Sequence, residues 1–307
     1  MTDPFGPEIS DLIVDYDAAT LARRDVMKQH VLDTLRDGRV PSRAVRVART
    51  LVEQRGYVDR AHVDGILVRS HLELQRLHEE FRVGATVRSL LVPMLALIRT
   101  SITQRPIRVV DLGCGMGFIL RWLAARGQLG DDIELIGADY NVALIDAAQR
   151  LADEEQLRCK FVVANAFDLE TPAHVVISTG VLHHFRGDSL AQVFAQHQQS
   201  TALGFVHVDI RPSKIAPLGA WVFHQARMRE PLARFDGFWS AVRAHSTQTL
   251  LDAVAQGAPE FTRATVDARP GLMALLRIFH AAVGARRELA EQLPAAYASF
   301  GSRFALA

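Results

Sequence analysis

The residues best suited to chemistry lie in one short stretch near the middle of the chain. An apolar run ends at Asp111, and alternate glycines follow at Gly113, Gly115 and Gly117. This pattern predicts a buried strand, a loop without Cβ atoms to obstruct a ligand, and a helix that begins near Phe118. A dinucleotide site would need its third glycine where Phe118 stands, so the pattern favours a different cofactor over nicotinamide.

The segments that follow repeat this order of an apolar run and a polar end. Residues 133–139 are predicted to form a second strand and end at Asp139, the position from which doubly wound folds bond ribose hydroxyls. Residues 161–164 are predicted to form a third strand, which leads to Asn165 and Ala166. Because apolar strands alternate with amphipathic helices, the sequence predicts an α/β fold with a mostly parallel sheet.

Two residues suited to acid–base chemistry lie at or just beyond the ends of the next two predicted strands, residues 175–179 and 205–210. His183 comes after the fourth strand, and Asp209 lies near the end of the fifth. Since open α/β sheets hold reactive groups at the carboxyl ends of their strands, we expect the two side chains at one edge. Histidine suits a general base because its ordinary pKa lies near neutrality. The alternative is that His183 only packs beside the cofactor.

Together these segments resemble class I S-adenosylmethionine (SAM) methyltransferases over the middle third of the chain. The resemblance rests on the aspartate and alternate glycines, on the acid that ends the second strand, and on residues 180–185 after the fourth. It implies a doubly wound, Rossmann-like, mostly parallel sheet of seven strands with an N-terminal helical cap. It also implies that SAM is held by seven residues: Asp111, Gly113, Gly115, Gly117, Asp139, Asn165 and Ala166. Asn165 stands where the family has an aspartate, but its carbonyl oxygen can still accept a hydrogen bond from adenine.

The implied reaction is methyl transfer to a small-molecule acceptor, with a hydroxyl oxygen of a natural product or metabolite favoured. The context of His183 resembles O-methyltransferases in which such a histidine is the base and an aspartate, here Asp209, its partner. Residues 201–204 depart from that pattern, since they replace its Pro-Gly-Gly turn. A catalytically silent SAM-binding regulator or partner subunit is the alternative, and a nicotinamide oxidoreductase a weaker one. No metal site is predicted, because His207 and Asp209 on one face are too common a pair.

The regions on either side are expected to differ in structure. Residues 1–104 are predicted as a helical cap region, and residues 105–307 as the SAM-binding domain. Apolar residues recur at helical spacing in residues 27–35, 44–52 and 63–81. Gly56 is predicted as the C-terminal cap of the second of these helices. Residues 261–266 and 273–280 are predicted as the last two strands, with a helix from residue 286.

Composition predicts a cytoplasmic enzyme. The chain has 35 basic and 34 acidic residues and a formal charge of +1, so we expect neither nucleic acid nor a membrane as a partner. The two cysteines, Cys114 and Cys159, indicate neither a disulfide framework nor a zinc site. Residues 1–8 lack the pattern of a secretory signal. The apolar run at residues 90–98 is too short by itself to span a bilayer.

Overall fold

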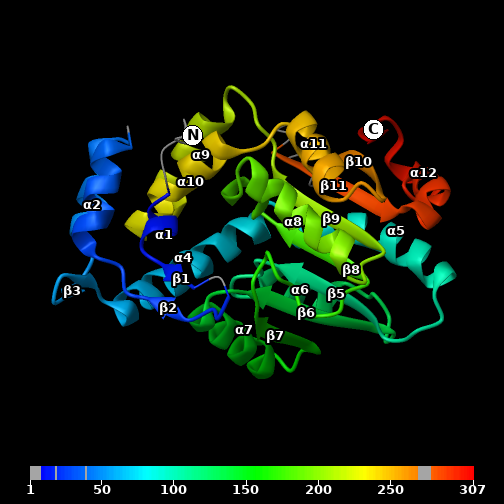
Figure 1. Ribbon diagram of the computed structural model, residues 1–307, viewed down its shortest axis with the longest axis horizontal. Helices are drawn as coiled ribbons and strands as arrows, with labels where there is room; N and C mark the ends of the chain where they lie inside the picture. The colour runs from blue at the N-terminus through cyan, green and yellow to red at the C-terminus, as the bar shows by residue number, and fades with distance from the viewer. Residues whose placement is uncertain (1–7, 18, 39, 269–277) are drawn as a thin grey trace. The chain divides into compact units, whose positions relative to one another are not determined.

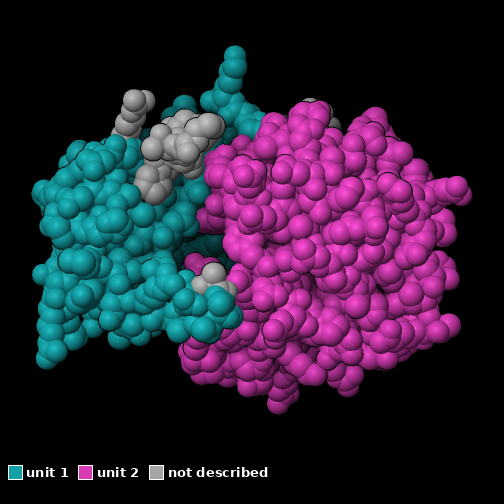
Figure 2. All heavy atoms as spheres, in the orientation of Figure 1, with its two compact units in different colours: residues 1–77, 212–243 teal, residues 78–211, 244–307 magenta. Residues whose placement is uncertain are grey.

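The computed structural model describes residues 8–17, 19–38, 40–268 and 278–307. They form two compact units, coloured separately in Figure 2. The smaller unit comprises Met1–Leu77 and Pro212–Arg243, and the larger unit comprises His78–Arg211 and Ala244–Ala307.

The larger unit is built on one eight-stranded sheet (Figure 1). Its strands are β5 (Ile107–Leu112), β6 (Ile133–Asp139), β7 (Cys159–Val163), β8 (Val175–Thr179), β9 (Gly204–Ile210), β10 (Phe261–Ala268), β11 (Phe279–Arg286) and β12 (Phe304–Leu306). Their order is β12-β10-β11-β9-β8-β5-β6-β7, and the five strands from β9 to β7 are parallel. The predicted fold class is confirmed. The sheet has eight strands instead of seven, because the short β12 pairs with the outer side of β10.

Helices cover both faces of this sheet, as the doubly wound prediction requires. They are α5 (Val83–Ser101), α6 (Phe118–Arg126), α7 (Val142–Glu154), α8 (Asp188–Gln199) and α11 (Thr247–Gly257). Along β9, Phe205 packs in a core with α8 and α11, whereas the neighbouring Gly204 faces Met94 of α5. Successive strand residues point to opposite faces, so α5 lies on the face away from α8 and α11.

The last long strand of the sheet differs in position from the prediction. The seventh strand was predicted at residues 273–280, of which 273–277 lie outside the described residues; β11 instead runs over Phe279–Arg286. Its eight residues are mostly alanine, glycine and valine, and seven are buried. Arg287–Gln292 then forms a 3₁₀ helix, at the place where a helix from residue 286 was predicted.

The smaller unit is mainly helical. Its helices are α1 (Ile9–Leu12), α2 (Lys28–Asp37), α3 (Ser42–Arg49), α9 (Ala216–Arg227), α10 (Pro231–Arg243) and residues 60–77 of α4 (Arg60–Glu80). Two hairpins, β1 (Asp15–Tyr16) with β2 (Arg23–Arg24) and β3 (Glu53–Gln54) with β4 (Tyr57–Val58), were not predicted. Gly56 lies in the turn of the second hairpin with φ +84°, so its predicted role as a helix cap is wrong.

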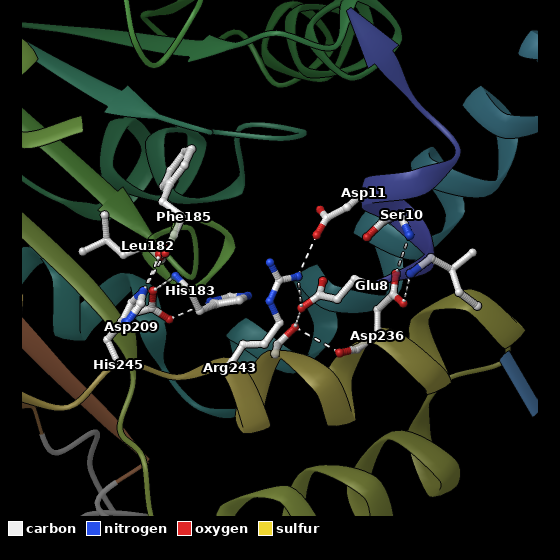
Figure 3. Close-up of polar contacts among 12 residues, drawn as sticks. Glu8, Ser10, Asp11, Leu182, His183, Phe185, Asp209, Asp236, Arg243 and His245 are labelled. Atoms are coloured by element: carbon white, nitrogen blue, oxygen red, sulfur yellow. Dashed lines mark hydrogen bonds and ion pairs between the residues drawn. The ribbon is translucent and has the colours of Figure 1, made fainter. Parts of the chain in front are cut away.

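A buried acid anchors the start of this unit to α10. Asp236 accepts hydrogen bonds from the backbone of Ile9 at 3.0 Å and Ser10 at 3.1 Å (Figure 3). Burial, and then the charge of Glu8, raise the pKa of Asp236 to about 8. Arg243 forms an ion pair with Asp11 at 2.6 Å. Residues far apart in sequence therefore make one unit.

Helix α5 belongs to the larger unit, so the two units do not divide at residues 104 and 105, where the sequence placed the boundary. It packs on β9 and α6, and an added Cβ at Gly84 would lie 2.4 Å from the ring of Trp122 in α6. Among the described residues, α5 alone is long and apolar enough to cross a membrane, although the run at residues 90–98 was judged too short. A buried core helix passes the same test, and 56% of its apolar window is buried.

Candidate active site

The glycine loop leaves the end of β5 and is fastened to the end of β6. The backbone N–H of Gly113 donates to the carbonyl oxygen of Ala138 at 2.7 Å, and that of Gly115 donates to Asp139 Oδ2 at 2.9 Å. Gly113, Gly115 and Gly117 have φ of +67°, +53° and +68°. These left-handed conformations favour glycine, so the alternation of glycines follows from the path of the backbone.

Close packing sets a second requirement for glycine in this loop. A Cβ added at Gly117 would lie 2.2 Å from the ring of Phe161 on β7, and one at Gly137 would lie 2.4 Å from the same ring. The loop therefore rests directly on Phe161. The backbone of the cofactor loop is positioned by the sheet beneath it.

Asp111 supplies a buried carboxyl group beside this loop. It is 2% exposed, and its Oδ1 has no hydrogen-bond partner among the described residues. Burial, and then the negative charge of Asp139, raise the pKa of Asp111 to about 8. An unsatisfied buried acceptor is costly, and a cationic donor would relieve that cost. The site thus fits the ammonium group of a methionine moiety, the part of SAM assigned to this residue by resemblance.

Asp139, the predicted ribose ligand, lies at the end of β6. Its Oδ1 accepts from the backbone N–H of Asn141 at 2.9 Å, while Oδ2 holds Gly115. A carboxylate can accept about four hydrogen bonds, so capacity remains for hydroxyl donors. The carboxylate therefore shapes the loop, and ribose binding stays a prediction.

The predicted adenine residues follow β7. The Oδ1 of Asn165 accepts from the backbone N–H of Phe167 at 2.9 Å, which forms a tight turn. Ala166 lies within this turn. The ring of Phe167 is 37% exposed and meets Phe185 edge-on at 5.3 Å between centroids. Phe167 was not predicted as a site residue, although an aromatic residue just after a strand end was a visible signal.

The structure brings the predicted acid–base pair together. His183 lies in a short 3₁₀ helix, Leu182–His184, after β8, and Asp209 lies on β9. The Nδ1 of His183 is 2.9 Å from Asp209 Oδ1, and the backbone N–H of His183 donates to Oδ2 at 2.9 Å (Figure 3). Both side chains are buried. One carboxylate therefore holds the histidine by its ring and by its backbone.

Asp209 is ionised in this setting. Burial alone would raise its pKa, but the charge and hydrogen bond of His183, the N–H of Ile210 and the charge of His280 lower it to about 2. The N–H of Ile210 donates to Oδ1 at 2.7 Å. A permanently charged acceptor is suited to orient an imidazole.

Two further histidines support this pair and were missed by the sequence analysis. The Nε2 of His245 lies 3.1 Å from the carbonyl oxygen of Leu182 and 2.8 Å from that of Phe185, so it bridges the turn that carries His183. His280 lies opposite Asp209 on β11. Both have a lowered pKa, chiefly because of burial.

A second histidine chain lies deeper in the larger unit. The Nδ1 of His207 is 2.8 Å from the hydroxyl of Ser178, and its Nε2 is 2.7 Å from Nε2 of His197 on α8. Burial lowers the pKa of His197 to about 3 and that of His207 well below its ordinary value. Both rings are therefore neutral. Because the protein engages both nitrogens of His207, this residue is part of the core.

Comparisons with known proteins match the chain to one family model and to solved structures of low sequence identity. Residues 109–204 match the model of a family described as a methyltransferase domain. Magnesium protoporphyrin IX methyltransferase from Synechocystis is 17% identical with a TM-score of 0.45, and the match covers 84% of this chain and 99% of that one. A SAM-dependent methyltransferase from Aquifex aeolicus is 11% identical with a TM-score of 0.42, over 62% of this chain and 88% of that one. No curated protein matches the chain significantly.

The glycine loop follows β5, and the acid that fastens it ends β6, in a sheet with the doubly wound order. The family match begins in β5 and extends to the start of β9. Residues 109–204 of this chain therefore match a methyltransferase domain by sequence, and they lie in a sheet with the doubly wound order.

Proposed function

We propose that the enzyme transfers the methyl group of SAM to a hydroxyl oxygen of a small-molecule acceptor, with His183 as the general base. The observation that carries this proposal is the buried contact of 2.9 Å between His183 Nδ1 and Asp209 Oδ1. An amine can attack through its lone pair once it is neutral, whereas a hydroxyl gains most from a base that removes its proton. A positioned base therefore favours an oxygen acceptor.

The ionised Asp209 sets the form of the histidine. Because the carboxylate only accepts hydrogen bonds, Nδ1 of His183 carries the hydrogen, and Nε2 is left as the basic nitrogen. The backbone bond from His183 to Oδ2 fixes the turn, and His245 bridges the carbonyl groups of Leu182 and Phe185 from the other side. These contacts hold the imidazole in one orientation, which lowers the entropy cost of proton removal.

The cofactor would be held by the residues that the sequence assigned. Asp111 would face the ammonium group, the loop of Gly113, Gly115 and Gly117 would line the methionine chain, and Asp139 would accept from the ribose. Asn165 and Ala166 would lie toward the adenine. When bound, SAM supplies a methyl group that is already activated on a sulfonium. The protein's remaining tasks are to align the acceptor, exclude water and accept the proton.

The test is S-adenosylhomocysteine release from a panel of phenols and alcohols and a matched panel of amines. For a hydroxyl acceptor, His183→Ala should lower kcat about a hundredfold to ten-thousandfold and leave SAM affinity nearly unchanged. Asp209→Asn should show a smaller loss in the same direction. His30→Ala, at an exposed position of α2, is the matched control.

Three outcomes would contradict the proposal. Equal losses of SAM affinity and kcat in His183→Ala would place this residue in the cofactor pocket. Full activity in both variants would leave alignment of the acceptor as the source of catalysis. Calorimetric SAM binding with no turnover on any acceptor would favour the SAM-binding regulator instead.

A further inference from the structure

Helix α9 of the smaller unit exposes an apolar face. None of the residues from Ala216 to Arg227 is buried. Four large apolar residues on or beside this helix are exposed to 73%, 63%, 45% and 53%: Ile215, Leu218, Trp221 and Val222. Their spacing of three and four residues places them on one side of the helix. We call these four residues the α9 face.

The other side of α9 is held by α10 and α3. The Nδ1 of His224 lies 2.9 Å from the carbonyl oxygen of Ala233, and the backbone at Gly237 approaches the same ring closely. Gln225 donates to the carbonyl oxygen of Arg234 at 3.3 Å and accepts from Arg43 at 2.7 Å. The helix is therefore anchored by its polar side, and the α9 face points away from its own unit.

The chain segment that carries the α9 face is basic. Residues 212–229 contain one lysine, two arginines and no acid. Lys214 and Arg229 are exposed at the two ends of the helix. Two acids lie at the C-terminal end of α9: Glu73 accepts from the backbone N–H groups of Arg229 and Glu230, and Glu230 pairs with Arg69 at 3.1 Å.

We propose that α9 docks the enzyme on the surface of an anionic lipid bilayer, with the helix lying in the plane of the interface. Apolar side chains that include a tryptophan enter the boundary between headgroups and acyl chains, and flanking bases attract anionic headgroups. Trp221 has the amphipathic ring that is typical of this depth. A bilayer would explain both the exposed apolar residues of the α9 face and the absence of acids from residues 212–229.

The size of the face favours a bilayer over a second copy of the chain. A helix of 12 residues is about 18 Å long and presents a strip about 10 Å wide. That strip falls well short of the ~800 Å² that each partner contributes to a stable interface. Insertion into lipid needs only one helix face, so the strip is sufficient for reversible binding.

The experiment is sedimentation of the full chain with vesicles of phosphatidylcholine alone and of phosphatidylcholine with phosphatidylglycerol. We expect binding to the anionic vesicles, with a blue shift of fluorescence that disappears in Trp221→Phe. Leu218→Ser should weaken binding about tenfold. The matched control is Leu72→Ser, which removes an exposed leucine of α4 in the same unit and should bind like the wild type.

The electrostatic part has its own test. Lys214→Gln removes one positive charge and should weaken binding to anionic vesicles about fivefold. Arg158→Gln, at a side chain that is 93% exposed in the larger unit, is the control and should have no effect. Raising the salt concentration should weaken binding of the wild type.

Three results would overturn the proposal: no binding to anionic vesicles, equal binding by Leu218→Ser and the wild type, or a stable dimer in light scattering that Leu218→Ser dissociates. The last result would assign the α9 face to a second copy. Vesicle binding is measured without an acceptor, so these outcomes are independent of whether the proposed methyl transfer is correct.

Discussion

Asp111, the proposed partner of the SAM ammonium group, is expected to couple cofactor binding to proton release. Its pKa of about 8 means that the carboxyl group holds a proton at pH 7 in the free protein. A cationic ammonium beside it would favour the ionised form. SAM binding should therefore release a proton, and the affinity for SAM should rise with pH up to about 8, by at most tenfold per pH unit.

Calorimetry in buffers of different ionisation enthalpy would measure this proton. Asp111→Asn should bind SAM more weakly and with no proton release at this site. Asp188→Asn, at an exposed residue at the start of α8, should retain both properties. An affinity that is constant from pH 6 to pH 8 would contradict the assignment of Asp111.

At this scale the sequence was most informative where neighbours in the chain are neighbours in space. Asp111 and the three glycines lie in one loop, and the placement of Asp139 follows from the parallel pairing of β5 with β6. His245 and His280 were missed because both lie far from His183 in sequence. His245 precedes α11, and His280 lies on β11. No local pattern indicates a contact that is made by antiparallel pairing at long range.

At the scale of secondary-structure elements, a substitution of Gly117 would test how the glycine loop packs on the sheet. Gly117→Ala combines a left-handed φ of +68° with a clash against Phe161. Backbone strain and overpacking together should lower the free energy of unfolding by ~2 to 5 kcal/mol. Urea unfolding would measure the loss, and SAM affinity should fall with it because the loop must shift.

Gly180→Ala separates the two causes. Gly180 has a φ of +67°, but an added Cβ would meet nothing within 4 Å. This variant should therefore lose only the strain part, about 1 to 2 kcal/mol. If both variants lose the same stability, the contact with Phe161 is not a constraint on the loop.

Prediction of elements succeeded where apolar runs were strong. The predicted bounds of β6 and β8 are those observed, and Asn141 caps α7 by accepting from Ala143 and Leu144. The position of β11 was wrong because alanine and glycine carry little hydrophobic or strand signal, although packing buries them. Gly56 was misassigned because a hairpin turn and a helix cap both favour left-handed glycine.

At the scale of the whole molecule, buried titratable groups predict a stability maximum near pH 6.5. The carboxyl groups of Asp111 and Asp236 have pKa values of about 8 in the folded protein, against 3.8 as the ordinary value. Between pH 3.8 and about pH 8, only the folded protein keeps these protons. The free energy of unfolding therefore falls as the pH rises toward 8. Each group contributes up to about 1.4 kcal/mol per pH unit.

Below pH 6.5 the histidines act in the opposite direction. Burial lowers the pKa of His197 from 6.5 to about 3 and that of His207 further. Four other histidines have lowered pKa values: His174, His224, His245 and His280. The unfolded chain takes up these protons first, so their contribution is complete above pH 6.5 and is lost as pH falls toward 3. They outnumber the two acids, and net stability should fall.

Urea unfolding at pH 5, 6.5 and 8 would check both limbs. Asp236→Asn should flatten the decline between pH 6.5 and pH 8, since it removes one of the two groups that must stay protonated. A free energy of unfolding that keeps rising to pH 8 would show that these acids are ionised in the folded protein.

Averages over the chain were the weakest guide at this scale. The formal charge of +1, from which no membrane partner was expected, is an average over the whole chain and does not report the acid-free segment of residues 212–229. The boundary at residue 105 was placed where the glycine-rich domain starts in sequence. The two compact units divide differently: α5 packs on β9 in the larger unit, and α9 and α10 belong to the smaller unit although they follow β9 in sequence.

The short β12 closes an otherwise open edge of the sheet. It pairs with β10 from Ala264 to Val266, and Phe304 within it stacks on Tyr297 at 5.5 Å between centroids. Removal of residues 304–307 would leave the outer N–H and C=O groups of β10 ready to pair with another chain. The shortened protein should keep its chemistry and lose solubility, so a fusion partner that displaces β12 would promote aggregation of an enzyme that is otherwise correctly folded.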